Sequence, residues 1–96
     1  MKSLARSLIL HNKIKTTEAK AKELRPYIEK LVTKSMEESQ ANKRLILSRI
    51  GSKEVVEKLF TTLAPKYKDR KGGYTRVLKL PRRTQDASKM AQIEFV

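Results

Sequence analysis

The sequence has no cysteine, no tryptophan and one histidine, and aromatic residues make up 5% of the chain. The absence of cysteine excludes disulfide frameworks, thiolate zinc sites and a cysteine nucleophile, and one histidine cannot form a histidine-rich metal site. No apolar run approaches the ~18 residues of a membrane-spanning helix, and the run Leu8 to Leu10 is too short for a secretory signal. We therefore expect no metal, no other cofactor and no membrane partner.

Positive charge dominates what is present, because 23 lysines and arginines face 10 acidic residues and leave a net charge of +13. Residues 1–34 hold 9 basic and 3 acidic side chains, and residues 65–84 hold 8 and 1. Residues 35–64 are nearly balanced, with 5 and 4. Charge concentrated in this way indicates one or two anion-binding surfaces on a scaffold of nearly neutral helices.

Hydrophobic periodicity predicts a helix over residues 2–11 and a second over 18–36 that Thr17 caps. It also predicts a third helix ending at Gly51 and a fourth that Ser52 caps and Pro65 ends. Alternation predicts strands over 13–17 and 74–80 and a last strand that forms a hairpin through the loop 81–88. A kink is expected at Pro26. We expect an α+β fold with about four helices on a small sheet of about three strands and a C-terminal β-hairpin, and we expect residues 1–96 to form a single domain.

The apolar stripes of these elements predict one shared core. In the strand 74–80, Leu78 and Leu80 share one face and Thr75, Val77 and Lys79 the other. The predicted core consists of Leu24, Ile28, Leu31, Val56, Leu59, Phe60, Leu63, Leu78, Ile93 and Phe95.

No residue pattern indicates an active site or a small-molecule substrate. His11 lies near a helix end, where a contact with the helix dipole or a phosphate suits it better than general-base catalysis. Gly72 and Gly73 lack the remaining residues of the nucleotide-binding fingerprints. We therefore expect that the protein is not an enzyme.

The densest basic stretch, residues 66–76, mixes cations with two tyrosines and two glycines. Cations neutralise phosphates, glycine allows close backbone approach, and tyrosine rings can stack on unpaired bases, so the mixture suits irregular RNA. The alternatives are a solvated loop for the stretch and core-edge positions for Tyr67 and Tyr74. The two basic segments give as candidate RNA-binding residues Lys2, Arg6, Lys13, Lys15, Lys66, Lys68 and Lys71.

Several motifs occur in order along the chain: Thr16-Thr17, the run from Ala19 to Pro26, Leu47-Ser48-Arg49, Lys58-Leu59-Phe60 and Gly72-Gly73-Tyr74-Thr75-Arg76. With them the sequence resembles the bacterial-type large-subunit ribosomal protein seventeen family from Leu4 to Phe95. The resemblance implies a compact α+β domain in the large ribosomal subunit near the polypeptide exit tunnel. By position it adds as RNA-binding residues Lys20, Lys22, Arg25, Arg70, Tyr74, Arg76, Arg82 and Arg83.

The implied partners are large-subunit ribosomal RNA and neighbouring ribosomal proteins, and the implied location is the cytoplasmic ribosome, with an organellar ribosome as the alternative. The family normally has a His- and Arg-rich N-terminal arm, whereas Met1 here falls inside the first helix. A shortened chain, a misassigned start and a reduced or organellar ribosome all fit this departure. The alternative function is a free-standing DNA- or RNA-binding basic protein. The order of the strands and the identity of the phosphate-contacting cations stay open at this point.

Overall fold

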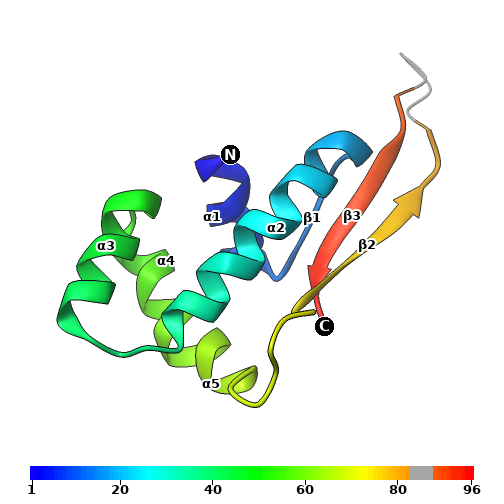
Figure 1. Ribbon diagram of the computed structural model, residues 1–96. Coiled ribbons are helices and arrows are strands. Elements are labelled where there is room, and N and C mark those ends of the chain that lie inside the picture. Colours follow the sequence, from blue (N-terminus) through cyan, green and yellow to red (C-terminus); the bar gives the residue numbers. More distant parts are fainter. Residues whose placement is uncertain (83–87) are drawn as a thin grey trace.

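The computed structural model describes residues 1–82 and 88–96, and it confirms the α+β class (Figure 1). Four helical segments in these residues pack against a three-stranded antiparallel sheet. The elements are α1 (Lys2–His11), β1 (Lys13–Thr17), α2 (Glu18–Ser35), α3 (Gln40–Ile50), α4 (Lys53–Lys58), the π-helical turn η1 (Leu59–Leu63), α5 (Ala64–Lys66), β2 (Thr75–Leu80) and β3 (Met90–Phe95).

The strand order is β1-β3-β2, so the last strand of the chain lies in the middle of the sheet. Strands β2 and β3 form the predicted C-terminal hairpin, with Leu80 opposite Met90 at one end and Thr75 opposite Phe95 at the other. Part of its predicted loop, residues 83–87, lies outside the described residues. Strand β1 pairs with the other edge of β3 and brings Ile14 opposite Ile93.

The helix boundaries follow the predicted capping residues. The Thr17 hydroxyl accepts a hydrogen bond from the Lys20 amide at 3.4 Å, and Ser52 caps α4 in the same way through Val55. Gly51 ends α3 with a φ of 75°, a left-handed conformation that glycine adopts without the steric cost of a side chain. These local signals need no tertiary information, which explains why the sequence alone locates them.

Two prolines, Pro26 and Pro65, lie inside helical segments. Helix α2 continues through Pro26 as one element of 18 residues. The prediction that Pro65 ends the fourth helix is wrong, because the helical path continues through η1 and α5 to Lys66. In η1 the pairing shifts to the wider π spacing, with the Ala64 amide bonded to the Leu59 carbonyl, and the proline then occupies the first turn of α5. The first turn of a helix tolerates proline because its amides need no partner within the helix.

The core lies between α2, the remaining helices and one face of the sheet. Every predicted core residue is buried except Leu78, whose side chain is 44% exposed. Residues opposite one another in a sheet point to the same side, and β2 places Thr75 and Val77 opposite the buried Phe95 and Ile93. The Thr75 and Val77 face of β2 is therefore the inward one, and the prediction that Leu78 lies in the core is wrong.

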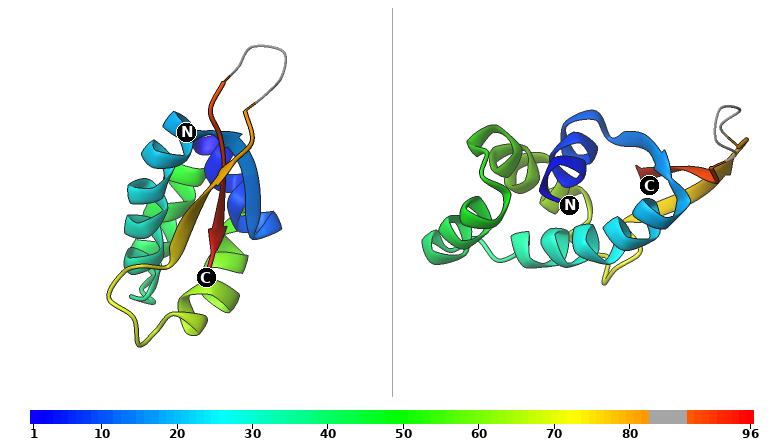
Figure 2. Two further views of the ribbon diagram at one scale, coloured as in Figure 1. Left: turned by 90° about the vertical axis from the view of Figure 1, so that its right-hand side faces the viewer. Right: turned by 90° about the horizontal axis from the view of Figure 1, so that it is seen from above.

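The molecule is elongated, with extents of 46 × 26 × 18 Å. Its radius of gyration is 13.9 Å, against about 12.5 Å for a compact chain of this length. Figure 2 shows α3 and α4 gathered at one end and the β2–β3 hairpin projecting at the other, with α2 extending along the side. This arrangement distributes the basic side chains over separate parts of a long surface.

Candidate nucleic-acid interface

The segment between α5 and β2 holds the densest group of exposed cations. We call residues 67–74 the basic loop; it carries Lys68, Arg70 and Lys71, all exposed, and Lys66 at the end of α5 is also exposed. Figure 1 shows this loop at the lower edge of the molecule, between α5 and the start of β2. The four side chains are exposed to an anionic partner, and lysine and arginine at this density match a phosphate backbone.

Glu29 of α2 anchors the end of the basic loop. Its Oε1 accepts a hydrogen bond from the Gly73 amide at 2.7 Å, and its Oε2 accepts from the amides of Tyr74 and Thr75, both at 3.0 Å. The Thr75 hydroxyl also donates to Oε2, at 2.9 Å. Within the loop, the Arg70 guanidinium donates to the Gly73 carbonyl at 2.8 Å. One carboxylate therefore holds three consecutive residues where the loop meets the sheet.

The ring of Tyr74 is wholly buried, with no exposed surface. It lies 5.3 Å, centroid to centroid, from the ring of Tyr67. Its hydroxyl donates to the Arg70 carbonyl at 3.1 Å and lies 3.0 Å from the Thr33 hydroxyl. The prediction that this side chain contacts RNA therefore does not fit the structure, in which the ring has no face to offer a base. The alternative of a core-edge position describes both tyrosines.

A second group of cations surrounds the start of α2. Lys22 forms an ion pair with Glu18 at 2.9 Å. The hydrogen bond within this ion pair lowers the pKa of the Glu18 carboxyl below its ordinary value, and partial burial of the carboxyl opposes that effect. The positive charges of Lys22, Lys79 and Lys89 lower the pKa further. Arg82 lines the same shallow depression beside Glu18, Lys79 and Lys89. We call Lys22, Lys79, Arg82 and Lys89 the helix-start cluster.

Sequence reasoning missed Lys79 and Lys89 as members of this cluster. Strand pairing brings them there, because Lys79 lies opposite Ala91 near the end of the hairpin and the Lys89 carbonyl accepts a hydrogen bond from the Glu18 amide at 2.9 Å. Counting charge by segment could have flagged Lys79, which lies within the basic stretch 65–84. No local signal marks Lys89, because residues 85–96 carry no basic excess.

The outer face of the sheet holds a third group. Lys13, Lys15 and Arg76 are exposed there, and strand pairing places Lys13 and Arg76 on either side of Glu94. The Arg76 guanidinium forms an ion pair with Glu94 at 3.3 Å, which leaves the two lysines with the larger share of uncompensated charge. The face also carries the exposed Leu78.

The remaining predicted residues are dispersed. Lys2, Lys20 and Arg25 are exposed on α1 and α2, whereas Arg6 is half-buried and its Nε is enclosed without a hydrogen-bond partner in the described part of the chain. Arg83 lies outside the described residues. Glu18 and Glu29 are 11 residues apart on α2, so the helix-start cluster and the loop anchor are about 16 Å apart along the helix axis. The cations thus form several patches along one elongated surface.

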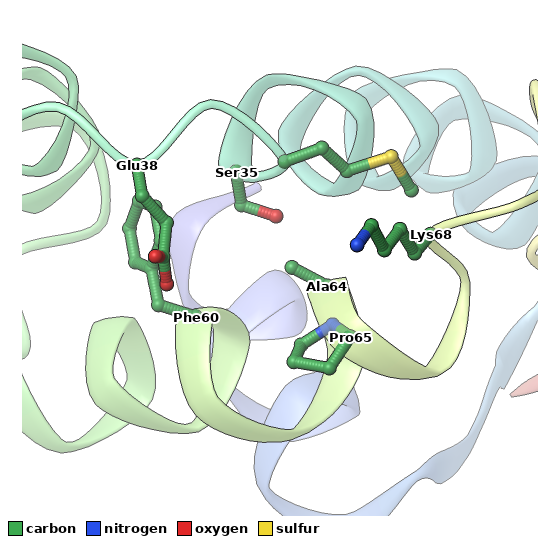
Figure 3. Close-up of a pocket in the computed structure, with 7 residues that line it drawn as sticks. Ser35, Glu38, Phe60, Ala64, Pro65 and Lys68 are labelled. Atoms are coloured by element: carbon green, nitrogen blue, oxygen red, sulfur yellow. The ribbon is translucent and has the colours of Figure 1, made fainter.

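The clefts of the described chain do not combine catalytic groups. The cleft in Figure 3, about 320 Å³, is lined by Ser35, Glu38, Phe60 and Lys68 among others, and Glu38 and Lys68 lie at its opposite ends. The Ser35 hydroxyl donates to the Val32 carbonyl at 2.7 Å and not to a catalytic base. Residues 1–82 and 88–96 contain no cluster of metal-ligating side chains. Their helices are too short or too polar to cross a membrane.

Comparison with known proteins decides the family. All of residues 1–96 match the family described as Ribosomal protein L17. The chain belongs to this ribosomal protein family. It is 52% identical over 97 residues to the large ribosomal subunit protein bL17 of Hydrogenobaculum sp., and the aligned region covers 100% of this chain and 82% of that protein. Identity to the bL17 protein of Sphingopyxis alaskensis is 53%, with 99% and 68% of the two chains covered, and identity to that of Mycoplasmopsis synoviae is 47%, with 100% and 85% covered.

Membership in the L17 family confirms the resemblance that the sequence motifs indicated. The family is one of ribosomal proteins and not of enzymes, in agreement with the prediction of no catalytic activity. The relatives are named as proteins of the large ribosomal subunit. Their names do not say which side chains bind RNA, so the three cation groups described above are the candidates that this fold supplies.

Proposed function

We propose that this protein is a structural component of the large ribosomal subunit that binds ribosomal RNA through the basic loop, the helix-start cluster and the outer face of the sheet. The observation that carries the proposal is the placement of exposed cations at these positions with few acidic neighbours, on a chain of net charge +13. Its location is then the ribosome, and other proteins of the large subunit are its neighbours. The relatives named bL17 support this assignment.

The charge distribution also explains how binding works. Each phosphate that a lysine or arginine neutralises releases condensed counterions, so affinity depends strongly on salt. The cations lie on a loop, on strands and at the start of a helix, and folded RNA presents phosphates at varied angles that such a surface can match. A free-standing DNA-binding regulator would instead place its base-reading residues along one recognition helix, and the cation groups described here do not follow that pattern.

The salt dependence of RNA binding tests the proposal. The chain is titrated with large-subunit ribosomal RNA transcribed in vitro at several salt concentrations. About 4 to 6 phosphate contacts predict a slope of log affinity against log salt of roughly −3 to −5. A slope near zero would contradict the electrostatic mechanism.

A matched pair of triple variants locates the contact surface. Replacing Lys68, Arg70 and Lys71 of the basic loop by Gln should make the slope shallower by about 2 to 3 units, because each lost contact removes ~0.7 to 0.9. The control replaces three exposed cations of the balanced middle segment, Arg44, Arg49 and Lys53, by Gln. It changes the net charge equally and should leave the slope near that of the unaltered protein. Equal effects of the two variants would show that net charge alone, and not this surface, governs binding.

Incorporation into the ribosome needs a separate measurement. Tagged protein in a cell lysate should co-sediment with large ribosomal subunits. Sedimentation with chromosomal DNA instead would favour the free-standing nucleic-acid-binding alternative, and sedimentation with membranes would contradict both.

A further inference from the structure

The backbone where the basic loop joins β2 forms an anion-binding nest. Three consecutive amides, those of Gly73, Tyr74 and Thr75, point at one carboxylate, that of Glu29, with N···O distances of 2.7 to 3.2 Å. Consecutive amides that converge in this way are the arrangement by which protein backbones bind phosphate and other anions. Here the anion belongs to the chain itself: it is the carboxylate of Glu29 on α2, 44 residues before Gly73.

The loop needs an anchor of this kind. Gly72 and Gly73 both have positive φ values, 121° and 67°, and glycine is the residue that loses most conformational freedom on ordering. The exposed cations Lys68, Arg70 and Lys71 precede these glycines by only a few residues. Without the carboxylate the amides would be left to solvent, and the loop would sample many conformations before RNA could bind a single one.

We propose that Glu29 is a positioning residue for RNA binding: its carboxylate occupies the nest of residues 73–75 and so holds the basic loop in its RNA-binding conformation before RNA arrives. The inference rests on the proposed function. It adds a role for an acidic residue in a surface whose other functional side chains are basic. Ordering the loop in advance removes an entropic cost from the binding step.

The proposal makes a prediction opposite in sign to simple electrostatics. Replacing Glu29 by Gln raises the net charge by one unit, which on charge alone would strengthen binding to RNA. If Glu29 positions the loop, the same change weakens binding, because a Gln side chain offers one acceptor oxygen and turns an NH₂ donor toward backbone donors. Glu23 provides the matched control. It is exposed on the same helix six residues earlier, about 9 Å along the axis and on a different face, so Glu23→Gln changes the charge equally without touching the nest.

The experiment measures the affinity of the full chain and its variants for transcribed large-subunit ribosomal RNA, with amide hydrogen exchange at residues 73–75 as the structural readout. Glu29→Gln should speed exchange at these amides and weaken RNA binding about tenfold, the effect of losing about 1.4 kcal/mol. The salt slope should stay unchanged, because the same phosphates are contacted. Glu23→Gln should bind as tightly as the unaltered chain or more tightly. Equal or tighter binding by Glu29→Gln would overturn the proposal.

A second variant decides the matter if Glu29→Gln does not fold. Thr75→Val preserves shape and charge and removes one of the four bonded groups, the hydroxyl that donates to Glu29 at 2.9 Å. It should weaken RNA binding by about twofold to threefold, within the range that one hydrogen bond supports. Unchanged affinity would overturn the positioning role. Absence of salt-dependent RNA binding by the unaltered chain would instead refute the proposed function, whatever the exchange rates at residues 73–75.

Discussion

Two substitutions of equal size test which face of β2 and β3 is buried. Ile93→Ala and Leu78→Ala each delete three carbon atoms, which corresponds to about 2.4 kcal/mol of transfer free energy for a fully buried side chain. Ile93 is wholly buried in the central strand, between Ile14 and Val77 on the neighbouring strands. Strands on both sides limit collapse around the cavity, so we expect Ile93→Ala to lower the free energy of unfolding by about 3 to 4 kcal/mol.

Leu78→Ala should cost about 1 kcal/mol or less, because the Leu78 side chain is 44% exposed on the outer face and its loss leaves no enclosed cavity. Urea unfolding followed by circular dichroism at 222 nm gives both values, and the dependence of the unfolding free energy on urea should match that of the unaltered chain. If Leu78→Ala cost as much as Ile93→Ala, either the outer face of the sheet would be covered in solution or the sheet register described here would be wrong.

Two further outcomes follow from the structure. Phe60 is 5% exposed, so Phe60→Ala should cost about 3 to 5 kcal/mol in the same unfolding assay, and a loss under about 1 kcal/mol would show that its ring lies outside the core. The pKa of the Glu18 carboxyl is lowered in the folded state, chiefly by its hydrogen bond to Lys22. The charged carboxylate therefore stabilises the fold at pH values above its ordinary pKa of 4.5. This contribution to stability is lost as the pH falls through the lowered pKa. The difference in Tm between the unaltered chain and Glu18→Gln should therefore be larger at pH 7 than at pH 3, and a constant difference would contradict the pairing.

The helices and strands were predictable because their signals are local. Thr17, Gly51 and Ser52 mark helix ends through hydrogen bonds and backbone angles that involve residues close in sequence. The alternation of apolar and polar residues in the last strand agrees with the burial of Ala91, Ile93 and Phe95. The π turn before Pro65 was not predictable, since no periodicity rule distinguishes it from an α-helix that ends at the proline.

The inward face of β2 was not predictable for a different reason. Alternation divides Thr75 and Val77 from Leu78 and Leu80, but it does not say which pair is buried. Hydrophobicity favours the leucines, whereas pairing with β3 turns the threonine and the valine inward, where Thr75 is buried and Val77 is half-buried. Thr75 is tolerated inside because its hydroxyl donates to Glu29. A polar residue with its hydrogen-bond partner already in place loses little by burial.

The amino-acid sequence by itself determined the class of the protein. Its charge concentrated in two segments, its lack of cysteine, its motifs and its capping signals all depend on composition or near neighbours. Only the tertiary structure decided the order β1-β3-β2, the burial of Tyr74, the gathering of Lys79 and Lys89 with Lys22 at the start of α2, and the bonds from residues 73–75 to Glu29. Each of these joins segments far apart in the chain. Such contacts depend on how whole elements pack, and no local pattern of residues encodes them.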